Sequence, residues 1–392
     1  MSALSKHALQ DAPVVQLVDA IIYKAIAQHA SDIHLESTPV GLRVRYRIDG
    51  ILYDQPLVDK KVMFQLLSRI KVLAHIDIAE KRVPQDGKFQ LVSGDNSIDL
   101  RVSTFPSIYG EKIVVRILDR AHTMIALDNL GLNAAMLASF SSLVNKSNGF
   151  FLATGPTGSG KTTTLYAALA LLSSPETNII TLEDPVEYNI DGITQGQINP
   201  DAGFTFEKGI RAILRQDPDI VMVGEIRDRQ TAQIAIEAAL TGHVVLSTLH
   251  TNDAPSVIMR LIDMGIEPFL INAAVSGVLA QRLARKICNN CRIAVEPTDY
   301  DKALLKRFNS TIDRIYKGKG CDVCFQLGYK GRIGIFELLE ISSTLRGLIV
   351  QHPNADALQL QARQGGMKTL AEDGLDKVAR GIITLQELAR IL

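Results

Sequence analysis

Residues Phe150–Thr164 read FFLATGPTGSGKTTT, and this stretch restricts the possible folds more than any other part of the chain. An apolar run typical of a buried strand stops at Gly155, and the loop after it matches the spacing G-x-x-x-x-G-K-[ST] up to Lys161 and Thr162. Glycines let backbone N–H groups approach phosphate oxygens, and a helix that begins at Lys161 would direct its positive dipole end at the same anion. The stretch therefore predicts a phosphate-binding loop between a strand and a helix.

The loop also predicts how a nucleotide and its metal would be held. We expect the Lys161 ammonium to contact the β- and γ-phosphates and the Thr162 hydroxyl to ligate Mg²⁺. The residues assigned to ATP binding are Gly155, Pro156, Thr157, Gly158, Ser159, Gly160, Lys161, Thr162 and Thr163. A phosphate loop alone could belong to a kinase, a GTPase or a motor, so other segments must distinguish these classes.

Three further apolar runs repeat the pattern of the strand before the loop. The four runs together are Phe150–Ala153, Asn178–Leu182, Ile220–Val223 and Val244–Ser247. Short, nearly unbroken apolar runs separated by helix-like segments are typical of buried parallel strands. We therefore predict a doubly wound α/β core over residues 134–285 and a helical C-terminal segment over residues 336–392.

Residues 1–120 follow a different pattern. A helical apolar face over residues 11–30 precedes several runs in which apolar and polar residues alternate, as in half-buried strands. These runs are Gly41–Gly50, Ile98–Ser103 and Lys112–Leu118. The first of them ends in Asp49-Gly50, which is a hairpin signal. The pattern predicts a small mixed α/β domain, joined to the core by a linker over residues 121–133.

The composition and the hydropathy pattern limit the partners and the cellular location that we expect for the protein. Its 392 residues include 42 basic and 42 acidic ones, so the formal net charge is zero, which argues against nucleic-acid binding over the whole surface. No apolar run approaches the ~20 residues needed to span a bilayer, and the first residues lack the apolar block of a secretory signal. We therefore expect a cytoplasmic protein whose cysteines are reduced and available to a metal.

All four cysteines lie in two closely spaced pairs. C-N-N-C contains Cys288 and Cys291, and C-D-V-C contains Cys321 and Cys324. Two knuckles that each present two thiolates can close a tetrahedron around Zn²⁺. Since four thiolates leave no open coordination position, the pattern predicts a structural zinc subdomain over residues 286–335.

Candidate catalytic side chains follow three of the apolar runs. T-L-E-D-P-V-E offers Glu183, Asp184 and Glu187, V-G-E offers Glu225, and V-V-L-S-T-L-H offers His250. Because the carboxyl ends of parallel strands meet at one edge of a sheet, we expect these groups near the phosphate loop. A carboxylate there can hold a metal-bound water or polarise the attacking water. Helix capping by Asp184, solvation of Glu187 and a purely structural role for His250 remain alternatives.

These motifs together resemble the ATPases of type II secretion and type IV pilus assembly, most closely GspE and the pilus extension ATPase PilB. The matching segments are A-S-D-I-H-L-E, I-D-I-A-E-K-R-V-P-Q-D-G-K, D-L-R-V-S-T-F-P-S-I-Y-G-E-K-I-V-V-R-I-L, G-P-T-G-S-G-K-T-T-T-L-Y, T-L-E-D-P-V-E-Y, R-A-I-L-R-Q-D-P-D-I-V-M-V-G-E-I-R-D, T-G-H-V-V-L-S-T-L-H-T-N-D-A and D-M-G-I-E-P-F-L. The resemblance implies a PAS-like N-terminal domain, a RecA-like P-loop ATPase core with a tetracysteine zinc insertion, and ATP hydrolysis coupled to secretion or pilus assembly.

The resemblance also implies roles for individual residues. Glu183 matches the catalytic base and Glu225 matches a glutamate near Mg²⁺, although these two roles could be exchanged. His250 matches a histidine segment of the active site. Arg101 and Arg116 match arginines that reach the nucleotide phosphates from the domain before the core. An arginine that offsets transition-state charge is worth roughly 10³–10⁵ in rate.

Finally, the resemblance implies an assembly. Members work as homo-hexameric rings on an inner-membrane platform protein, so we expect peripheral association with the inner membrane through partners. The zinc insertion is typical of secretion ATPases rather than pilus retraction ATPases, which favours assembly and export. Secretion and extension ATPases usually carry a further N-terminal docking domain. This chain begins almost at the arginine-bearing domain, so we expect a short family member or a shortened chain.

Two other functions stay open at this point. One is a DNA-uptake or DNA-transfer motor on the same core, against which the neutral net charge and the lack of a basic tract weigh. The other is a regulatory module that binds a nucleotide without hydrolysing it and recruits partners through the zinc subdomain.

Overall fold

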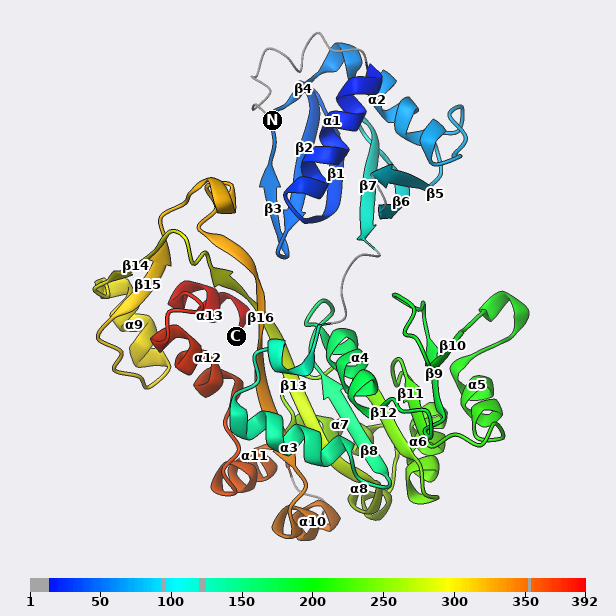
Figure 1. Cartoon of the computed structure of the whole chain (residues 1–392), viewed down its shortest axis with the longest axis vertical. Coiled ribbons are helices and arrows are strands. Elements are labelled where there is room, and N and C mark those ends of the chain that lie inside the picture. Colours follow the sequence, from blue (N-terminus) through cyan, green and yellow to red (C-terminus); the bar gives the residue numbers. More distant parts are fainter. Residues whose placement is uncertain (1–13, 94–95, 120–124, 352–353) are drawn as a thin grey trace. The chain divides into compact units, whose positions relative to one another are not determined.

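The computed structural model describes residues 14–93, 96–119, 125–351 and 354–392. The chain divides into two compact units, Met1–Thr123 and Met124–Leu392, here called the N-terminal and C-terminal units (Figure 1). The division lies within residues 121–133, the segment expected to be a linker. The predicted start of the first helix, before Val14, lies outside the described residues.

The N-terminal unit is built on one antiparallel sheet with strand order β3-β2-β1-β7-β6-β5, in which β4 also pairs with β2. Its elements are α1 (Val14–Ala27), β1 (Ala30–Thr38), β2 (Gly41–Ile48), β3 (Ile51–Asp54), β4 (Val58–Asp59), α2 (Lys60–Leu73), β5 (Gln85–Ser93), β6 (Asn96–Ser107) and β7 (Gly110–Asp119). The β2–β3 turn has positive φ at Asp49 (48°) and Gly50 (86°), as a tight hairpin requires. The predicted mixed α/β fold of this region is confirmed.

The two faces of this sheet differ in polarity. Leu100 and Val102 of β6 are buried, whereas Arg101 and Ser103 between and beyond them are exposed. Side chains alternate across a strand, so the apolar set lies on the face covered by protein and the arginine lies on the open face. The face that remains open is the one that carries the candidate phosphate-binding residues.

The C-terminal unit contains a second sheet with strand order β10-β9-β11-β12-β8-β13-β16. Neighbouring strands are parallel except for β13 and β16. Up to β13 its elements are η1 (Leu127–Asn129), α3 (Ala134–Val144), β8 (Gly149–Thr154), α4 (Lys161–Leu172), β9 (Ile179–Glu183), β10 (Thr194–Gln197), η2 (Pro200–Ala202), α5 (Phe206–Ile213), β11 (Ile220–Val223), α6 (Arg229–Leu240), β12 (Val244–Leu249), α7 (Pro255–Asp263), α8 (Pro268–Ala274) and β13 (Val275–Ile287). The predicted doubly wound core is confirmed.

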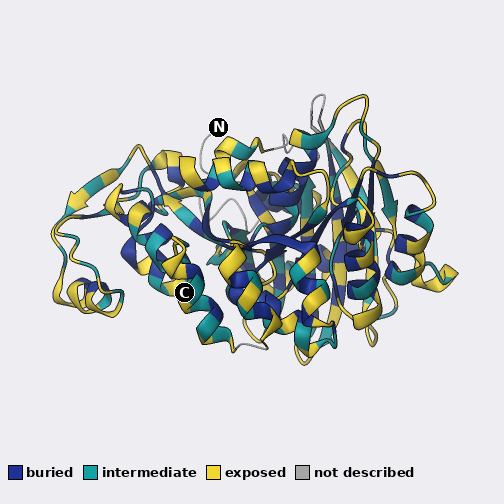
Figure 2. Cartoon of the chain, turned by 90° about the horizontal axis from the view of Figure 1, so that it is seen from below, coloured by how far each residue is buried: buried dark blue, intermediate teal, exposed yellow. Residues whose placement is uncertain are grey.

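Helices cover this sheet on both sides. On one side Phe140 of α3 and Leu165 of α4 join Phe151 of β8 in one apolar cluster, and the Phe140 and Phe151 rings meet edge to face at 5.1 Å. On the other side α6, α7 and α8 share a second cluster with Phe150 and Val245. The central strands are therefore buried along most of their length (Figure 2). This three-layer arrangement leaves only the strand ends available for chemistry.

Two long strands were not predicted. β13 and β16 (Tyr329–Glu340) extend the sheet beyond β8, and the cysteine-bearing region lies between them in the chain. That region contains β14 (Arg292–Val295), α9 (Asp299–Arg307), β15 (Ile315–Gly318) and η3 (Asp322–Cys324). The sequence pattern does not predict β13, because Gln281, Arg282 and Arg285 interrupt its apolar residues.

The C-terminal segment is helical, as predicted. It consists of α10 (Ser343–Val350), α11 (Ala355–Gln364), α12 (Leu370–Ala379) and α13 (Leu385–Ile391). Arg285 of β13 binds the buried Glu387 of α13, with Nη2 2.8 Å from Oε2, and this contact attaches the last helix to the sheet. Among the described residues, no helix is both long and apolar enough to cross a membrane.

Candidate functional site

The phosphate loop joins β8 to α4 at the carboxyl edge of the second sheet, between the strand and helix that the sequence predicts. Gly155, Gly158 and Gly160 have φ values of 147°, 77° and 89°, which favour glycine. A Cβ at Gly155 would lie 2.4 Å from the carbonyl oxygen of Gln281, and one at Gly160 would lie 2.7 Å from its Nε2. The loop thus packs directly on β13, and larger residues would displace it.

Lys161 is buried and points back onto the loop. Its Nζ donates hydrogen bonds to the carbonyl oxygens of Gly155 (2.7 Å) and Pro156 (3.2 Å). Burial lowers the pKa of this ammonium and the charge of Arg282 lowers it further, whereas the Glu225 carboxylate opposes both effects. Lys161 and Glu225 are therefore close enough to interact electrostatically.

Two hydroxyl groups of the loop region are available to a ligand. The Ser159 Oγ is enclosed and has no hydrogen-bond partner among the described residues. An unpartnered buried hydroxyl is unusual in a folded protein and indicates a group that pairs with something else. Within the same described part, the half-buried Thr162 hydroxyl also makes no hydrogen bond. With the free N–H groups of the first turn of α4, this donor set fits a phosphate group and its metal.

Glu183 and Glu225 come from the carboxyl ends of neighbouring strands. Leu182 of β9 pairs in register with Val223 of β11, so the two carboxylates follow adjacent strand ends. A Cβ at Gly224 would lie 3.4 Å from the Cα of Glu183, so the two strand ends are in close contact. The strands thus bring the two predicted carboxylates to one edge of the sheet.

The surroundings of Glu183 enclose it almost completely, with 2% of the residue exposed. Its Oε2 accepts a hydrogen bond from the Tyr166 hydroxyl. Its Oε1 accepts from the Thr181 hydroxyl at 2.6 Å and from Gln195 Nε2 at 3.2 Å. Three donors on three different elements therefore fix the position of this carboxylate.

Glu225 is more open, with 21% of its side chain exposed. Its Oε1 pairs with the Arg227 guanidinium, and its Oε2 lies 3.3 Å from Nε2 of His250. Arg227 also lies 3.5 Å from Oδ2 of Asp184, so it links the ends of β9 and β11. The structure thus places His250 against one of the two predicted carboxylates.

Four neighbours of these groups were not predicted as site residues: Tyr166, Gln195, Arg227 and Gln281. Arg227 lies two positions after Glu225, so its proximity in sequence could have indicated it. Tyr166 lies on the buried face of a helix and resembles an ordinary core residue. Nothing in the local sequence distinguishes Gln195 or Gln281, because their contacts are long-range.

The two predicted arginines of the N-terminal unit are direct neighbours. Arg101 of β6 pairs in register with Arg116 of β7, and Lys88 of β5 pairs with Arg101 on its other side. All three are exposed and line a hollow of about 640 Å³ together with Ser103. Arg116 Nε lies 3.1 Å from Oδ1 of Asp32, and Asp86 also lines the hollow. This hollow is positively charged and suits an anion, and Lys88 is a contributor that the sequence pattern did not indicate.

Three arginines occupy alternate positions of β2 and therefore lie on one face of the strand. In the structure each pairs with a carboxylate of the same unit. Arg43 Nε lies 2.7 Å from Asp54, Arg45 Nη2 lies 2.7 Å from Glu36, and Arg47 Nε lies 3.6 Å from Asp32.

The four predicted zinc ligands converge on one point. All four Sγ atoms lie within 4.8 Å of one another, with separations of 3.9 Å for Cys288–Cys321, 3.9 Å for Cys291–Cys324 and 3.7 Å for Cys321–Cys324. A tetrahedron with Zn–S bonds of about 2.3 Å has edges of about 3.8 Å. The sulfur positions therefore fit a tetrahedral Zn²⁺ site.

Donors around the sulfurs are those that stabilise thiolates. The backbone N–H groups of Cys321 and Gly328 donate to Cys324 Sγ at 3.3 and 3.2 Å, and Asn290 Nδ2 donates to Cys321 Sγ at 3.3 Å. Such contacts orient metal ligands and offset their charge. The donor chemistry and the geometry thus agree on a metal centre.

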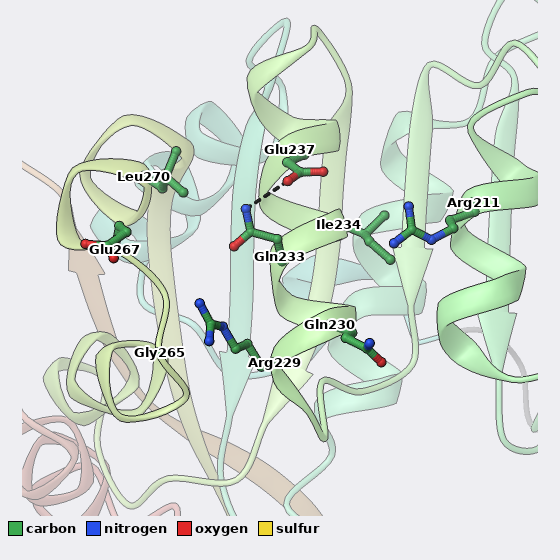
Figure 3. Close-up of a pocket in the computed structure, with 9 residues that line it drawn as sticks. All are labelled: Arg211, Arg229, Gln230, Gln233, Ile234, Glu237, Gly265, Glu267 and Leu270. Atoms are coloured by element: carbon green, nitrogen blue, oxygen red, sulfur yellow. Dashed lines mark hydrogen bonds between the residues drawn. The ribbon is translucent and has the colours of Figure 1, made fainter.

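A separate pocket of about 500 Å³ lies between α5, α6 and the segment that leads into α8 (Figure 3). Arg211, Arg229, Glu237 and Glu267 line it, and Gln233 donates a hydrogen bond to Glu237 across 2.8 Å. It contains no residue of the phosphate loop and neither candidate carboxylate, so the predicted chemistry lies elsewhere.

Comparison with known proteins decides the family. Residues 7–390 match the family described as type II/IV secretion system protein. The chain belongs to this family. It is 49% identical over 384 residues to the type II secretion system ATPase E of Vibrio cholerae, covering 97% of this chain and 76% of that protein. It is 47% identical over 387 residues to the type IV pilus assembly ATPase PilB of Thermus thermophilus, covering 98% and 44%.

Comparison with solved structures also finds ATPases of similar fold. The pilus retraction motor PilT with bound ADP matches with a TM-score of 0.63 at 27% identity over 95% of each chain. The Legionella pneumophila ATPase DotB matches with a TM-score of 0.70 over 99% of this chain and 97% of its own, and at 20% identity it supports the fold alone. The prediction of an ATPase of secretion or pilus assembly is therefore confirmed at the level of the family.

Proposed function

We propose that this secretion-family ATPase is a cytoplasmic motor, peripheral to the inner membrane. It would form hexameric rings and hydrolyse ATP to drive assembly of a type II secretion pseudopilus or a type IV pilus through an inner-membrane platform protein. The observation that carries the hydrolytic part is the phosphate loop after β8, on the sheet edge where Glu183 and Glu225 follow neighbouring strands. The motor part rests on similarity to named secretion and pilus ATPases.

Each group of the site has a task in this proposal. The N–H groups of the first turn of α4 and the Lys161 ammonium bind the phosphates and offset the charge that develops on them. Thr162 and Glu225 would hold Mg²⁺, which neutralises phosphate charge when bound. Glu183 accepts the proton of a water whose oxygen attacks the γ-phosphorus, while the bond to the bridging oxygen breaks and ADP leaves. His250 keeps the Glu225 carboxylate in place.

Glu183→Gln tests this assignment. We expect kcat to fall about 10²–10⁴-fold while ATP affinity is retained, because the amide cannot accept the proton. Glu225→Gln should instead weaken Mg²⁺-dependent nucleotide binding. Phosphate release and fluorescent-nucleotide titrations measure both. Near-normal hydrolysis by Glu183→Gln would show that Glu183 is not the base. A loss of kcat in Glu225→Gln with nucleotide binding unchanged would show that Glu225 is the base instead.

Glu176→Gln is the matched control, because this exposed carboxylate lies in the loop before β9 and makes no side-chain ion pair among the described residues. Its turnover should equal that of the unmodified chain. The same assays with added duplex and single-stranded DNA test the DNA-motor alternative, for which stimulated hydrolysis would be required. Nucleotide binding without any turnover in assembled rings would support a regulatory module instead.

The arginine pair gives a second prediction. We propose that Arg101 and Arg116 bind phosphate oxygens during hydrolysis, and Arg101→Ala or Arg116→Ala should lower kcat about 10³-fold. Arg43→Ala is the control, since Arg43 is another exposed arginine of the same sheet and forms an ion pair with Asp54. Steady-state phosphate release checks all three variants. Unchanged turnover in both Arg101→Ala and Arg116→Ala would exclude these side chains from the reaction.

A further inference from the structure

We propose that Tyr166 is a positioning residue for hydrolysis, whose hydroxyl fixes Oε2 of Glu183 relative to the helix that carries Lys161. This inference rests on the proposed role of Glu183 as the base. It concerns a residue outside the phosphate loop and outside the two carboxylate-bearing strands.

Packing holds the Tyr166 ring in one place. Tyr166 lies on α4, which begins at Lys161, and the residue is completely buried. Its ring meets that of Tyr188 edge to face, with centroids 4.7 Å apart and an interplanar angle of 81°. A ring fixed in this way places its hydroxyl at one point. The helix therefore determines the position of the oxygen that contacts Glu183.

The hydrogen-bond pattern also fixes the direction of the proton. The Tyr166 oxygen accepts from the backbone N–H of Glu187 and from Nε2 of Gln195, both at 3.4 Å. An ionised carboxylate has no hydrogen to donate, so the Tyr166 hydroxyl hydrogen is directed at Glu183. Burial, followed by the contact with Glu183, raises the pKa of Tyr166, so the hydroxyl keeps its proton. Tyr166 is thus a permanent donor to Glu183.

This donor determines which part of the carboxylate can act. An ionised carboxylate has about four acceptor positions. Thr181 and Gln195 occupy two on Oε1, and Tyr166 occupies one on Oε2. Among the described residues, the remaining position is the second lone pair of Oε2. Tyr166 therefore sets the direction of the lone pair that would receive the proton of the attacking water.

The test is Tyr166→Phe, which removes one oxygen and keeps the ring. We expect kcat to fall about 10–100-fold, the usual effect of losing a hydrogen bond to a charged group, with KM for ATP changed less than about twofold. In a Glu183→Gln background the same change should cause no further loss, because a residue that acts through Glu183 has nothing left to position. Phosphate release and nucleotide titration give these values.

Tyr188→Phe is the matched control. It makes the same chemical change in the other ring of the pair, and its hydroxyl has no hydrogen bond within the described residues, so kcat should stay unchanged. Thr181→Val is a second variant that keeps the side-chain shape and removes a donor from Oε1. Its loss should be smaller than that of Tyr166→Phe, since Gln195 still contacts Oε1.

Several results would overturn the inference. These are normal kcat in Tyr166→Phe, an equal loss in Tyr188→Phe, or a loss that is undiminished in the Glu183→Gln background. Should Tyr166→Phe fail to fold, a Thr181→Val protein with unaltered kcat would count against a positioned carboxylate. An inactive Glu183→Gln together with a fully active Tyr166→Phe refutes the positioning role only. A near-normal Glu183→Gln refutes the proposed base itself.

Discussion

Lys161→Ala is expected to lose about 10³-fold or more in kcat/KM for ATP hydrolysis. The ammonium would offset charge on the β- and γ-phosphates, and removing a charge-stabilising donor of this kind usually costs about 10²–10³, more for phosphoryl groups. Lys161 also donates hydrogen bonds to the carbonyl oxygens of Gly155 and Pro156. Its loss therefore removes two contacts that hold the loop in its conformation. Phosphate release and nucleotide binding should therefore both fall.

Lys146→Ala is the control for this variant. Lys146 is an exposed lysine between α3 and β8 and contacts neither the loop nor a candidate carboxylate. Its hydrolysis rate and its melting temperature should equal those of the unmodified chain. Retained hydrolysis in Lys161→Ala would show that the phosphates are bound elsewhere.

Loss of zinc is expected to have the second large effect. Structural zinc contributes about 10 kcal/mol or more of folding free energy in small metal-stabilised modules. Cys321→Ser removes one ligand from the cluster, so we expect zinc content to fall below one atom per chain and residues 288–328 to become sensitive to protease. Metal analysis, limited proteolysis and thermal unfolding measure these effects.

Val323→Ser controls for polarity within the same turn. Val323 lies between Cys321 and Cys324, is 46% exposed and leaves all four thiols in place. Zinc content and protease resistance should be retained in this variant. A zinc-free Cys321→Ser protein that resists protease as well as the unmodified chain would contradict a structural role for the metal.

The sequence patterns of single segments are sufficient to predict the central strands of the second sheet. β8, β9, β11 and β12 are short, mostly apolar and buried along nearly their whole length, so each is recognisable from its own residues. β13 is not, because its polar side chains are satisfied by distant partners. Gln281 accepts from Thr164 on α4 at 2.7 Å, and Arg282 donates to the carbonyl of Asn252 at 2.8 Å. Such contacts exist only after folding and leave no periodicity to detect.

The residues of the candidate site also fall into those that short sequence patterns predict and those that they do not. The phosphate loop and the cysteine pairs have fixed local spacings, so the sequence predicts them directly. The alternation around Arg101 predicts an exposed strand face, but the pairing of Arg101 with Arg116 depends on the register of β6 and β7. The contact of Tyr166 with Glu183 depends on how α4 packs on β9. Neither relationship is encoded in a short segment.

The ladder between β13 and β16 has a consequence for how proteins of this design can vary. The chain leaves the sheet after Ile287 and returns at Tyr329, and these two residues are partners in the ladder. Residues 288–328 are therefore an excursion whose two ends meet, so changes in its length need not shift the register of Ala280 with Thr154 beside the phosphate loop. A tight turn could replace the excursion in a related chain, and the sheet edge that carries the phosphate loop would keep its geometry. Residues 288–328 can thus vary in length and sequence without disturbing the sheet beside the phosphate loop.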